Sequence, residues 1–214
     1  MPSAGKKTPR PRLPQAMRAR GLLATRGMLR LRELTREGIA EETVARLVRR
    51  GHVVRLARGL YQLAGRPVDA RHSLAEVSKQ VPNATICLIS ALQFHGLTTQ
   101  LPSRVWIAID RQAWKPTTTS PPIKVVRFGP KALTIGIQIH RIEGVAVRVY
   151  SPAKTVVDCF RFRNKVGTDV AIEALRESLR TRQCTVNEIW KLAARLRILS
   201  VMKPYLEVMA CGPA

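Results

Sequence analysis

Four side chains in the first third of the chain combine suitable chemistry with helical spacing. They are Thr43, Arg46, Arg49 and Arg50. All four are assigned to one arc of a helix that starts near residue 41, and the opposite side carries Val44, Leu47 and Val48. Guanidinium groups bind phosphates and pair bidentately with guanine. The pattern predicts a DNA-reading helix, with Arg46 and Arg50 at or near base edges and Thr43 and Arg49 along the groove wall.

More basic residues flank this helix on both sides. Arg55 and Arg58 fall in a predicted hairpin, where we expect them to contact phosphates. A proline-containing segment ahead of the first helix carries further cations, Lys6, Lys7, Arg10 and Arg12. We expect this segment to be a flexible arm that becomes ordered in the minor groove of DNA. An arginine-rich helix face is often merely solvated, so the DNA-binding interpretation depends on the elements that carry these residues.

The predicted elements follow the order of a winged helix-turn-helix. Residues 14–26 place apolar side chains at helical spacing, and residues 29–38 form a second, short helix. A turn over residues 37–40 leads into the third helix, which Gly51 ends. Residues 53–56 and 60–63 are predicted as two strands joined across Gly59, which form the wing. In this arrangement the third helix enters the major groove.

The distribution of charge and a Gly- and Pro-containing segment divide the chain into two domains. The 214 residues contain 37 Lys plus Arg against 14 Asp plus Glu, a net charge of +23, which favours an anionic partner. The first 66 residues have 16 basic and 4 acidic side chains, so they carry about half of the net charge. The segment Ala64-Gly65-Arg66-Pro67 at this boundary has the Gly and Pro of a short linker. We predict a flexible basic arm at residues 1–12, a winged helix-turn-helix at 13–66 and a second domain at 67–214.

The second domain is expected to be a mixed α+β domain. Helices are predicted over residues 73–80 and 85–96, followed by strands over 104–109, 123–128, 135–140 and 145–150. Ser151 caps a helix that Pro152 starts, and residues 168–182, 186–196 and 201–209 complete a helical end. The whole chain is therefore predicted as an α+β protein whose carboxy-terminal end is helical.

Enzyme and metal signatures are missing from the sequence. Asp110 and Asp158 have no neighbouring carboxylate, and Asp158 is expected to cap a helix or pair with an arginine. Trp114 stands beside the loop-like run KPTTTSPP and, if exposed, could touch a partner. The cysteines form no C-x-x-C pair and the histidines are isolated: Cys87, Cys159, Cys184, Cys211, His52, His72, His95 and His140. We expect no catalytic residue, metal, cofactor or membrane span, and a cytosolic location.

The same segments resemble a known family. The run LRELTREGIAEETVARLVRRGHVVRLARGLYQL is similar to the amino-terminal domain of AbiEi-type antitoxins, with Arg49-Arg50-Gly51 and Arg58-Gly59-Leu60-Tyr61 in the family's places. Residues 89–92, 95–97, 105–108, 144–147 and 151–158 resemble the family's second domain, so the likeness extends over residues 22–179. It implies a repressor of its own operon and an antitoxin that counters a nucleotidyltransferase toxin.

Three functions remain open at this point. The first is the antitoxin-type repressor, with double-stranded operator DNA, inverted repeats included, and a cognate toxin as partners. The second is a winged-helix transcription factor that has no toxin partner. The third belongs to a different class: a nucleic-acid enzyme, such as a nuclease, that uses the second domain.

Overall fold

The first unit combines three helices with a small antiparallel sheet. In chain order its elements are α1 (Gln15–Arg26), β1 (Leu29–Arg30), α2 (Leu31–Arg36), α3 (Glu41–Arg49), β2 (Val53–Ala57) and β3 (Leu60–Leu63). The strand order is β1-β3-β2, with Leu29 opposite Tyr61 and Val53 opposite Leu63. The three helices and the β2–β3 hairpin match the predicted order. The strand β1, in a segment predicted as helical, is an addition.

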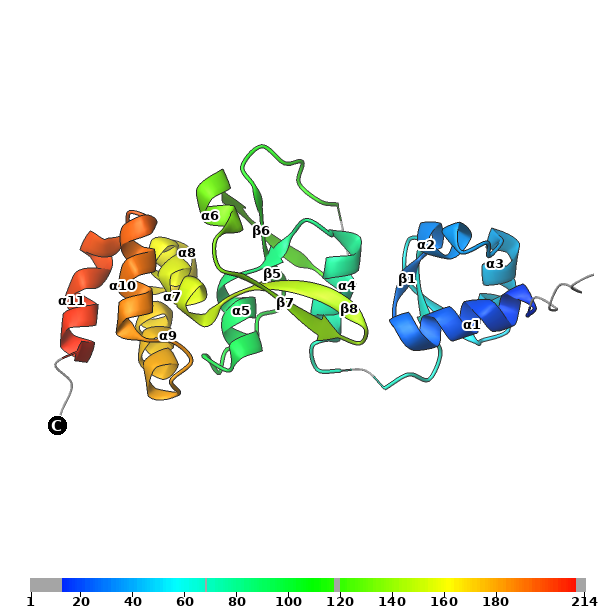
Figure 1. The fold of residues 1–214 in the computed structure, drawn as a ribbon, viewed down its shortest axis with the longest axis horizontal. Helices are drawn as coiled ribbons and strands as arrows, with labels where there is room; N and C mark the ends of the chain where they lie inside the picture. The colour runs from blue at the N-terminus through cyan, green and yellow to red at the C-terminus, as the bar shows by residue number, and fades with distance from the viewer. Residues whose placement is uncertain (1–12, 68, 118–119, 211–214) are drawn as a thin grey trace, which may run out of the picture. The chain divides into compact units, whose positions relative to one another are not determined.

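This computed structural model describes residues 13–67, 69–117 and 120–210. The chain divides into two units, Met1–Pro67 and Val68–Ala214, which Figure 1 shows in blue to cyan and in cyan to red. The predicted arm, residues 1–12, lies outside the described residues.

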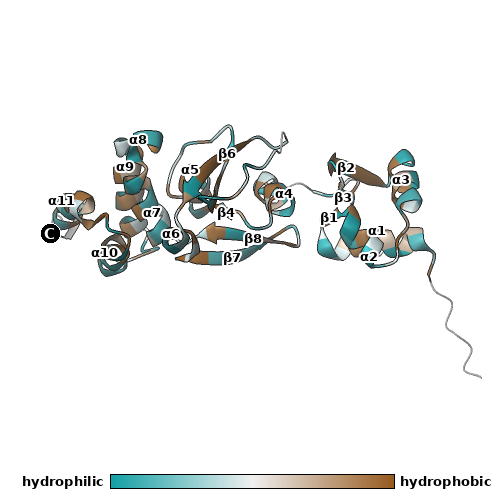
Figure 2. Cartoon of the chain, turned by 90° about the horizontal axis from the view of Figure 1, so that it is seen from above, coloured by the Kyte–Doolittle hydropathy of each residue, from teal (hydrophilic) through white to brown (hydrophobic). Residues whose placement is uncertain are grey.

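Packing of α3 against α1 and the sheet forms the core of the first unit. Val44 and Leu47 are 1% and 4% exposed, and they pack with Leu23, Leu34 and Val53. Burial of each such side chain contributes about 1.5–3 kcal/mol, so this stripe fixes which side of α3 faces inward. Figure 2 shows α3 carrying both hydrophilic and hydrophobic stretches.

A five-stranded mixed sheet forms the middle of the second unit. Its strands are β4 (Thr85–Ile86), β5 (Val105–Asp110), β6 (Ile123–Phe128), β7 (Ile137–Ile142) and β8 (Val145–Tyr150), in the order β6-β5-β4-β8-β7. β5 pairs parallel to β6, whereas β7 and β8 form an antiparallel hairpin. β6 and β7 are the two edge strands. The segment at Thr85–Ile86 was predicted as helical, and it is a strand because it pairs with β5 and β8.

Eight helices precede, separate and follow the strands of the sheet in the described residues. They are α4 (His72–Gln80), α5 (Leu88–His95), α6 (Pro130–Thr134), α7 (Pro152–Arg161), α8 (Arg163–Val166), α9 (Thr168–Arg180), α10 (Val186–Arg195) and α11 (Leu199–Ala210). The last five gather beside the sheet as a helical end (Figure 1). Ser151 caps α7 by accepting a hydrogen bond from the Lys154 backbone amide, as the sequence predicts. The fold is thus the expected α+β architecture with a helical carboxy-terminal end.

A buried ion pair lies within α7. Lys154 and Asp158 stand one helical turn apart, both are fully buried, and the Lys154 ammonium donates to Asp158 Oδ2. The ammonium also lies 4.1 Å from the centroid of the Tyr150 ring and 5.0 Å from that of Phe128. The sequence-based expectation that Asp158 caps a helix or pairs with an arginine is wrong, because the lysine of the same helix reaches it first.

Candidate nucleic-acid interface

The exposed arc of α3 presents three arginines to solvent. Arg46, Arg49 and Arg50 are exposed, and Val44 and Leu47 are buried on the other side of the helix. Within the described part of the chain, none of the three guanidinium groups takes part in an ion pair. Their donors therefore remain available to an external anion.

Thr43 does not belong to this arc, and the prediction that placed it there is wrong. Its side chain is 6% exposed, and Thr43 Oγ1 donates to Gln15 Oε1 over 3.1 Å. The same Gln15 oxygen accepts the backbone amide of Ala40 over 3.0 Å, at the start of α3. Thr43 precedes Leu47 by four residues, so it lies on the packed side of the helix. Its observed contacts join α3 to α1.

The hairpin between β2 and β3 carries the two predicted phosphate contacts. Arg55 and Arg58 are both exposed. Strand pairing shifts between Arg55 and Ala57, and the Arg55 Nε donates weakly to the Ala57 carbonyl oxygen over 3.4 Å. Gly59 has a φ of +70°, which lets the chain reverse without strain. The hairpin thus holds both guanidinium groups on its solvent side.

Other arginines of this unit have structural partners that sequence reasoning missed. Arg18 Nη2 donates to the Glu37 carbonyl oxygen over 2.5 Å, and Arg26 Nη1 contacts Glu37 Oε1 over 2.9 Å. Arg66 Nη1 donates to the carbonyl oxygens of Leu23 and Ala24. These three side chains fasten the ends of α1 and α2. They are therefore poorer candidates for DNA contact than the arginines of α3.

Two exposed arginines on α2 were not predicted as contacts. Arg32 and Arg36 stand one turn apart on this helix, and both are exposed. In helix-turn-helix proteins the helix before the recognition helix crosses the phosphate backbone. Their i, i+4 spacing was a visible signal for this role. Lys6, Lys7, Arg10 and Arg12, predicted as minor-groove contacts, lie outside the described residues.

The reactive side chains of the second unit are buried or engaged. Burial raises the pKa of the Cys87 thiol well above its usual value, and it also raises the pKa of Cys159 and Cys184. Burial lowers the pKa of His95, whose Nε2 lies 2.7 Å from the Tyr150 carbonyl oxygen. Within the described residues, no three His, Cys, Asp or Glu side chains are grouped to hold a metal ion. Protonated, buried thiols are poor nucleophiles.

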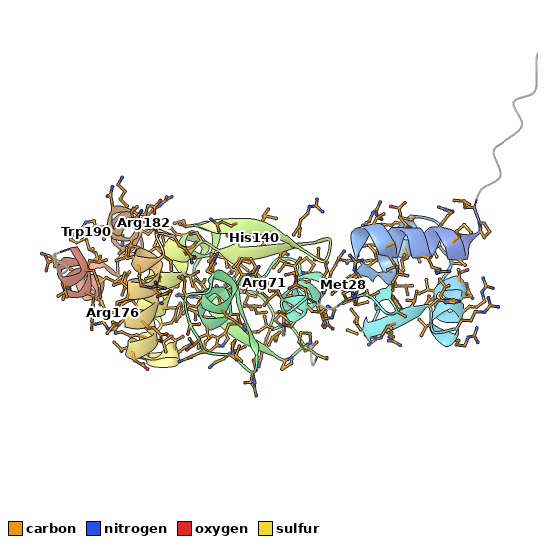
Figure 3. The ribbon with its side chains drawn as sticks, turned by 90° about the horizontal axis from the view of Figure 1, so that it is seen from below. Met28, Arg71, His140, Arg176, Arg182 and Trp190 are labelled. Carbon is orange, nitrogen blue, oxygen red and sulfur yellow. The ribbon has the colours of Figure 1, made fainter. Side chains whose placement is uncertain are left out.

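Two further features of this unit concern its histidines. His72 Nδ1 lies 3.0 Å from Glu143 Oε2, which links α4 to the β7–β8 turn. Arg71 stacks over the Phe94 ring at 4.4 Å from its centroid, and His140 lies 4.7 Å from the same ring, centroid to centroid. Figure 3 labels Arg71 and His140. These contacts join helices to the sheet.

Comparison with known proteins confirms the family resemblance for the first unit. Residues 17–64 match the family of transcriptional regulators described as AbiEi antitoxin. Among curated proteins, no sequence matches the chain. Among solved structures, the chain is similar to the crystal structure of the RV2827C protein from Mycobacterium tuberculosis, with a TM-score of 0.58 and 16% identity. That match covers 89% of this chain and 78% of the other, and at this identity it shows a shared fold.

No helix in the described ranges is both long and apolar enough to cross a membrane.

Proposed function

We propose that the chain is a sequence-specific DNA-binding repressor in which α3 enters the major groove of an operator. One observation carries this proposal: α3 buries Val44 and Leu47 and leaves Arg46 and Arg50 exposed and unpaired among the described residues. The match of residues 17–64 to AbiEi antitoxin regulators supports it. In this mode Arg46 and Arg50 contact base edges, and Arg49 follows the groove wall.

Phosphate contacts supply the remaining affinity. Arg55 and Arg58 on the hairpin bind the backbone beside the wing, and Arg32 and Arg36 on α2 bind it ahead of the recognition helix. Lys6, Lys7, Arg10 and Arg12 belong to the same proposal as minor-groove contacts of the arm. Thr43 acts through the position of α3 rather than through DNA, because its hydroxyl is already bonded to Gln15.

The biological role that we infer is that of an antitoxin. The chain represses its own operon and counters a nucleotidyltransferase toxin encoded beside it. The match of the first unit to AbiEi antitoxin regulators supports the antitoxin part of this role. It acts by binding and has no catalytic step, an inference supported by the buried, protonated thiols of the second unit. The domain organisation carries over: an arm at residues 1–12, the DNA-binding unit at 13–66 and an antitoxin unit at 67–214.

Operator binding is tested with the promoter region of the chain's own gene. Arg46→Ala and Arg50→Ala are each expected to weaken binding to this duplex by about 5- to 150-fold, since a bidentate base contact is worth about 1–3 kcal/mol. Arg176→Ala, an exposed arginine of α9, is the matched control and leaves operator affinity within about twofold. Unchanged affinity in both α3 variants would show that another surface reads the operator.

The antitoxin role is tested separately by co-expression. Cells that carry the neighbouring nucleotidyltransferase gene should survive only when this chain is present. Equal survival with and without the chain would remove the antitoxin role and leave the repressor role standing. Addition of Mg²⁺ and plasmid DNA to the pure chain should yield no cleavage, because we assign it no catalytic site.

A further inference from the structure

A second concentration of positive charge surrounds the edge strand β6. One hollow of about 390 Å³ runs along this strand, and its basic lining consists of Arg104, Lys115, Lys124, Arg127 and Lys165. A second hollow of about 280 Å³ lies between the segments after β5 and β6 and the helices α7 and α10, with the basic residues Arg111, Lys131, Arg161, Arg195 and Arg197. We call these ten side chains the β6 basic surface.

The two hollows adjoin each other. Arg127 lines the first, and its Nη1 donates to the carbonyl oxygen of Arg111, a residue of the second, over 2.6 Å. The same nitrogen donates to the Ala113 carbonyl oxygen over 2.8 Å. The cations of both hollows can therefore act on one extended ligand.

This surface has no internal neutralisation. All ten side chains are exposed, and none takes part in an ion pair within the described residues. The adjacent carboxylate of Asp110 accepts the backbone amide of Gln112 over 2.8 Å. Like charges that gather in a concave surface repel each other and raise the local concentration of anions. The expected ligand therefore carries several negative charges along its length.

An unusually exposed aromatic ring lies beside these cations. Trp114 is 96% exposed and falls between Arg111 and Lys115 in the chain. A large aromatic ring in water is unfavourable unless a partner covers it. Bases of a single strand provide such a partner, because each unpaired base offers a flat face for stacking. In a duplex, those faces are already stacked on one another.

We propose that the β6 basic surface binds single-stranded nucleic acid, with phosphates in the two hollows and a base stacked on Trp114. The concave lining, contributed by β6, loops and helices, suits one phosphodiester backbone, whereas the exposed α3 suits a duplex groove. This activity is distinct from operator binding. RNA and single-stranded DNA share the required chemistry, so both are used as probes.

The test measures fluorescence anisotropy of a labelled 12-nucleotide oligo(U), oligo(dT) or non-operator duplex on addition of the full chain. Arg111→Gln/Arg195→Gln is expected to weaken single-strand binding by tenfold or more. Arg141→Gln/Arg176→Gln removes the same charge from exposed sites on β7 and α9, the latter labelled in Figure 3, and should change affinity by less than twofold. Trp114→Ala should weaken binding by about 5- to 150-fold, the range for loss of one stacked base.

Several results would overturn the proposal. Equal weakening by the two double variants would indicate unspecific charge attraction, and full affinity in Trp114→Ala would exclude stacking. Tighter binding of the non-operator duplex than of either single strand, kept in Arg46→Ala/Arg50→Ala and lost in Arg111→Gln/Arg195→Gln, would show that the surface binds double helices. Binding only to an acidic peptide such as oligo-glutamate, with neither single strand bound, would assign the surface to a protein partner.

The α3 variants separate this inference from the proposed function. Arg46→Ala/Arg50→Ala should lose the operator duplex and keep oligo(U) or oligo(dT) within twofold. Loss of both ligands in this variant would mean that α3 accounts for all binding, and the second surface would be rejected. All substituted side chains are exposed, and an unchanged melting temperature verifies that each variant is folded.

Discussion

Asp158→Leu removes one partner of the buried pair in α7 and leaves the Lys154 ammonium without its counter-charge. Both side chains are fully buried, so water cannot take the place of the carboxylate. The Tyr150 and Phe128 rings remain near the ammonium, at 4.1 and 5.0 Å, and cation–π attraction offsets only about 2 kcal/mol. We therefore expect the free energy of unfolding of the second unit to fall by about 3–5 kcal/mol.

The double variant separates the pair from its individual charges. Lys154→Met should cost a similar 3–5 kcal/mol or so, because it leaves a buried carboxylate alone. Lys154→Met/Asp158→Leu should lose less stability than either single variant, since it buries no charge and fills a similar volume. The interaction free energy from this cycle measures the pair.

Intrinsic fluorescence makes the measurement specific to one unit. All three tryptophans, Trp106, Trp114 and Trp190, lie in the second unit. For a unit of this size, the single variants should lower the melting temperature by about 6–20 °C. Single variants that each cost less than about 1 kcal/mol, with an additive double variant, would refute the reasoning, because they would place the pair in contact with water.

Three further predictions follow from the packing. Gly136→Ala should destabilise the second unit by about 2 kcal/mol or more in the fluorescence assay, because Gly136 has a φ of +72° and a Cβ there would lie 2.7 Å from Lys154 Cβ; an unchanged midpoint would contradict this geometry. Thr43→Val loses the hydrogen bond to Gln15. It should lower the free energy of opening of α3, measured by amide exchange, by about 1 kcal/mol and keep operator affinity within twofold. Unchanged exchange together with weaker operator binding would return Thr43 to the DNA surface. Burial raises the pKa of Asp158 to about 6 from 3.8, so the folded chain keeps a proton that the unfolded chain has released. The stability of the native chain relative to Asp158→Asn should therefore fall between about pH 4 and 6, and a constant difference would disprove it.

Strong periodicity explains what the sequence predicts well. In α3, the apolar residues Val44 and Leu47 recur at helical spacing, so the arginines on the opposite side of the helix had to face water. The hairpin was predictable for a similar reason, because Gly59 marks a turn between two short apolar runs. These patterns are local, and they determine most of the first unit.

The sequence did not predict the short strands, because they form by pairing with neighbouring strands and have no hydrophobic pattern of their own. β1 and β4 have two residues each, too few to show any period. Leu29 becomes a strand residue because Tyr61 lies opposite, and Ile86 because Ile107 and Val149 lie on either side. Both partnerships join residues far apart in the sequence.

The surroundings of individual side chains could not be predicted either, because their partners also lie far away in the sequence. Thr43 is buried because Gln15, 28 residues earlier, supplies its partner. The β6 basic surface gathers residues from β6, three loops and four helices, so no segment of the sequence shows its charge density. The sequence did indicate that Trp114 could be exposed, because the composition of the neighbouring segment is typical of a loop.

The spacing of the buried pair also bears on how the second unit assembles. Lys154 and Asp158 stand four residues apart on one helix, so α7 can pair these two charges while it is still an isolated segment in water. The neighbouring helices α5, α9 and α10 then close over a dipole and not over two separate ions, which lowers the barrier to docking. A pair split between α7 and a strand would expose one bare ion at that moment, and such a chain would fold more slowly.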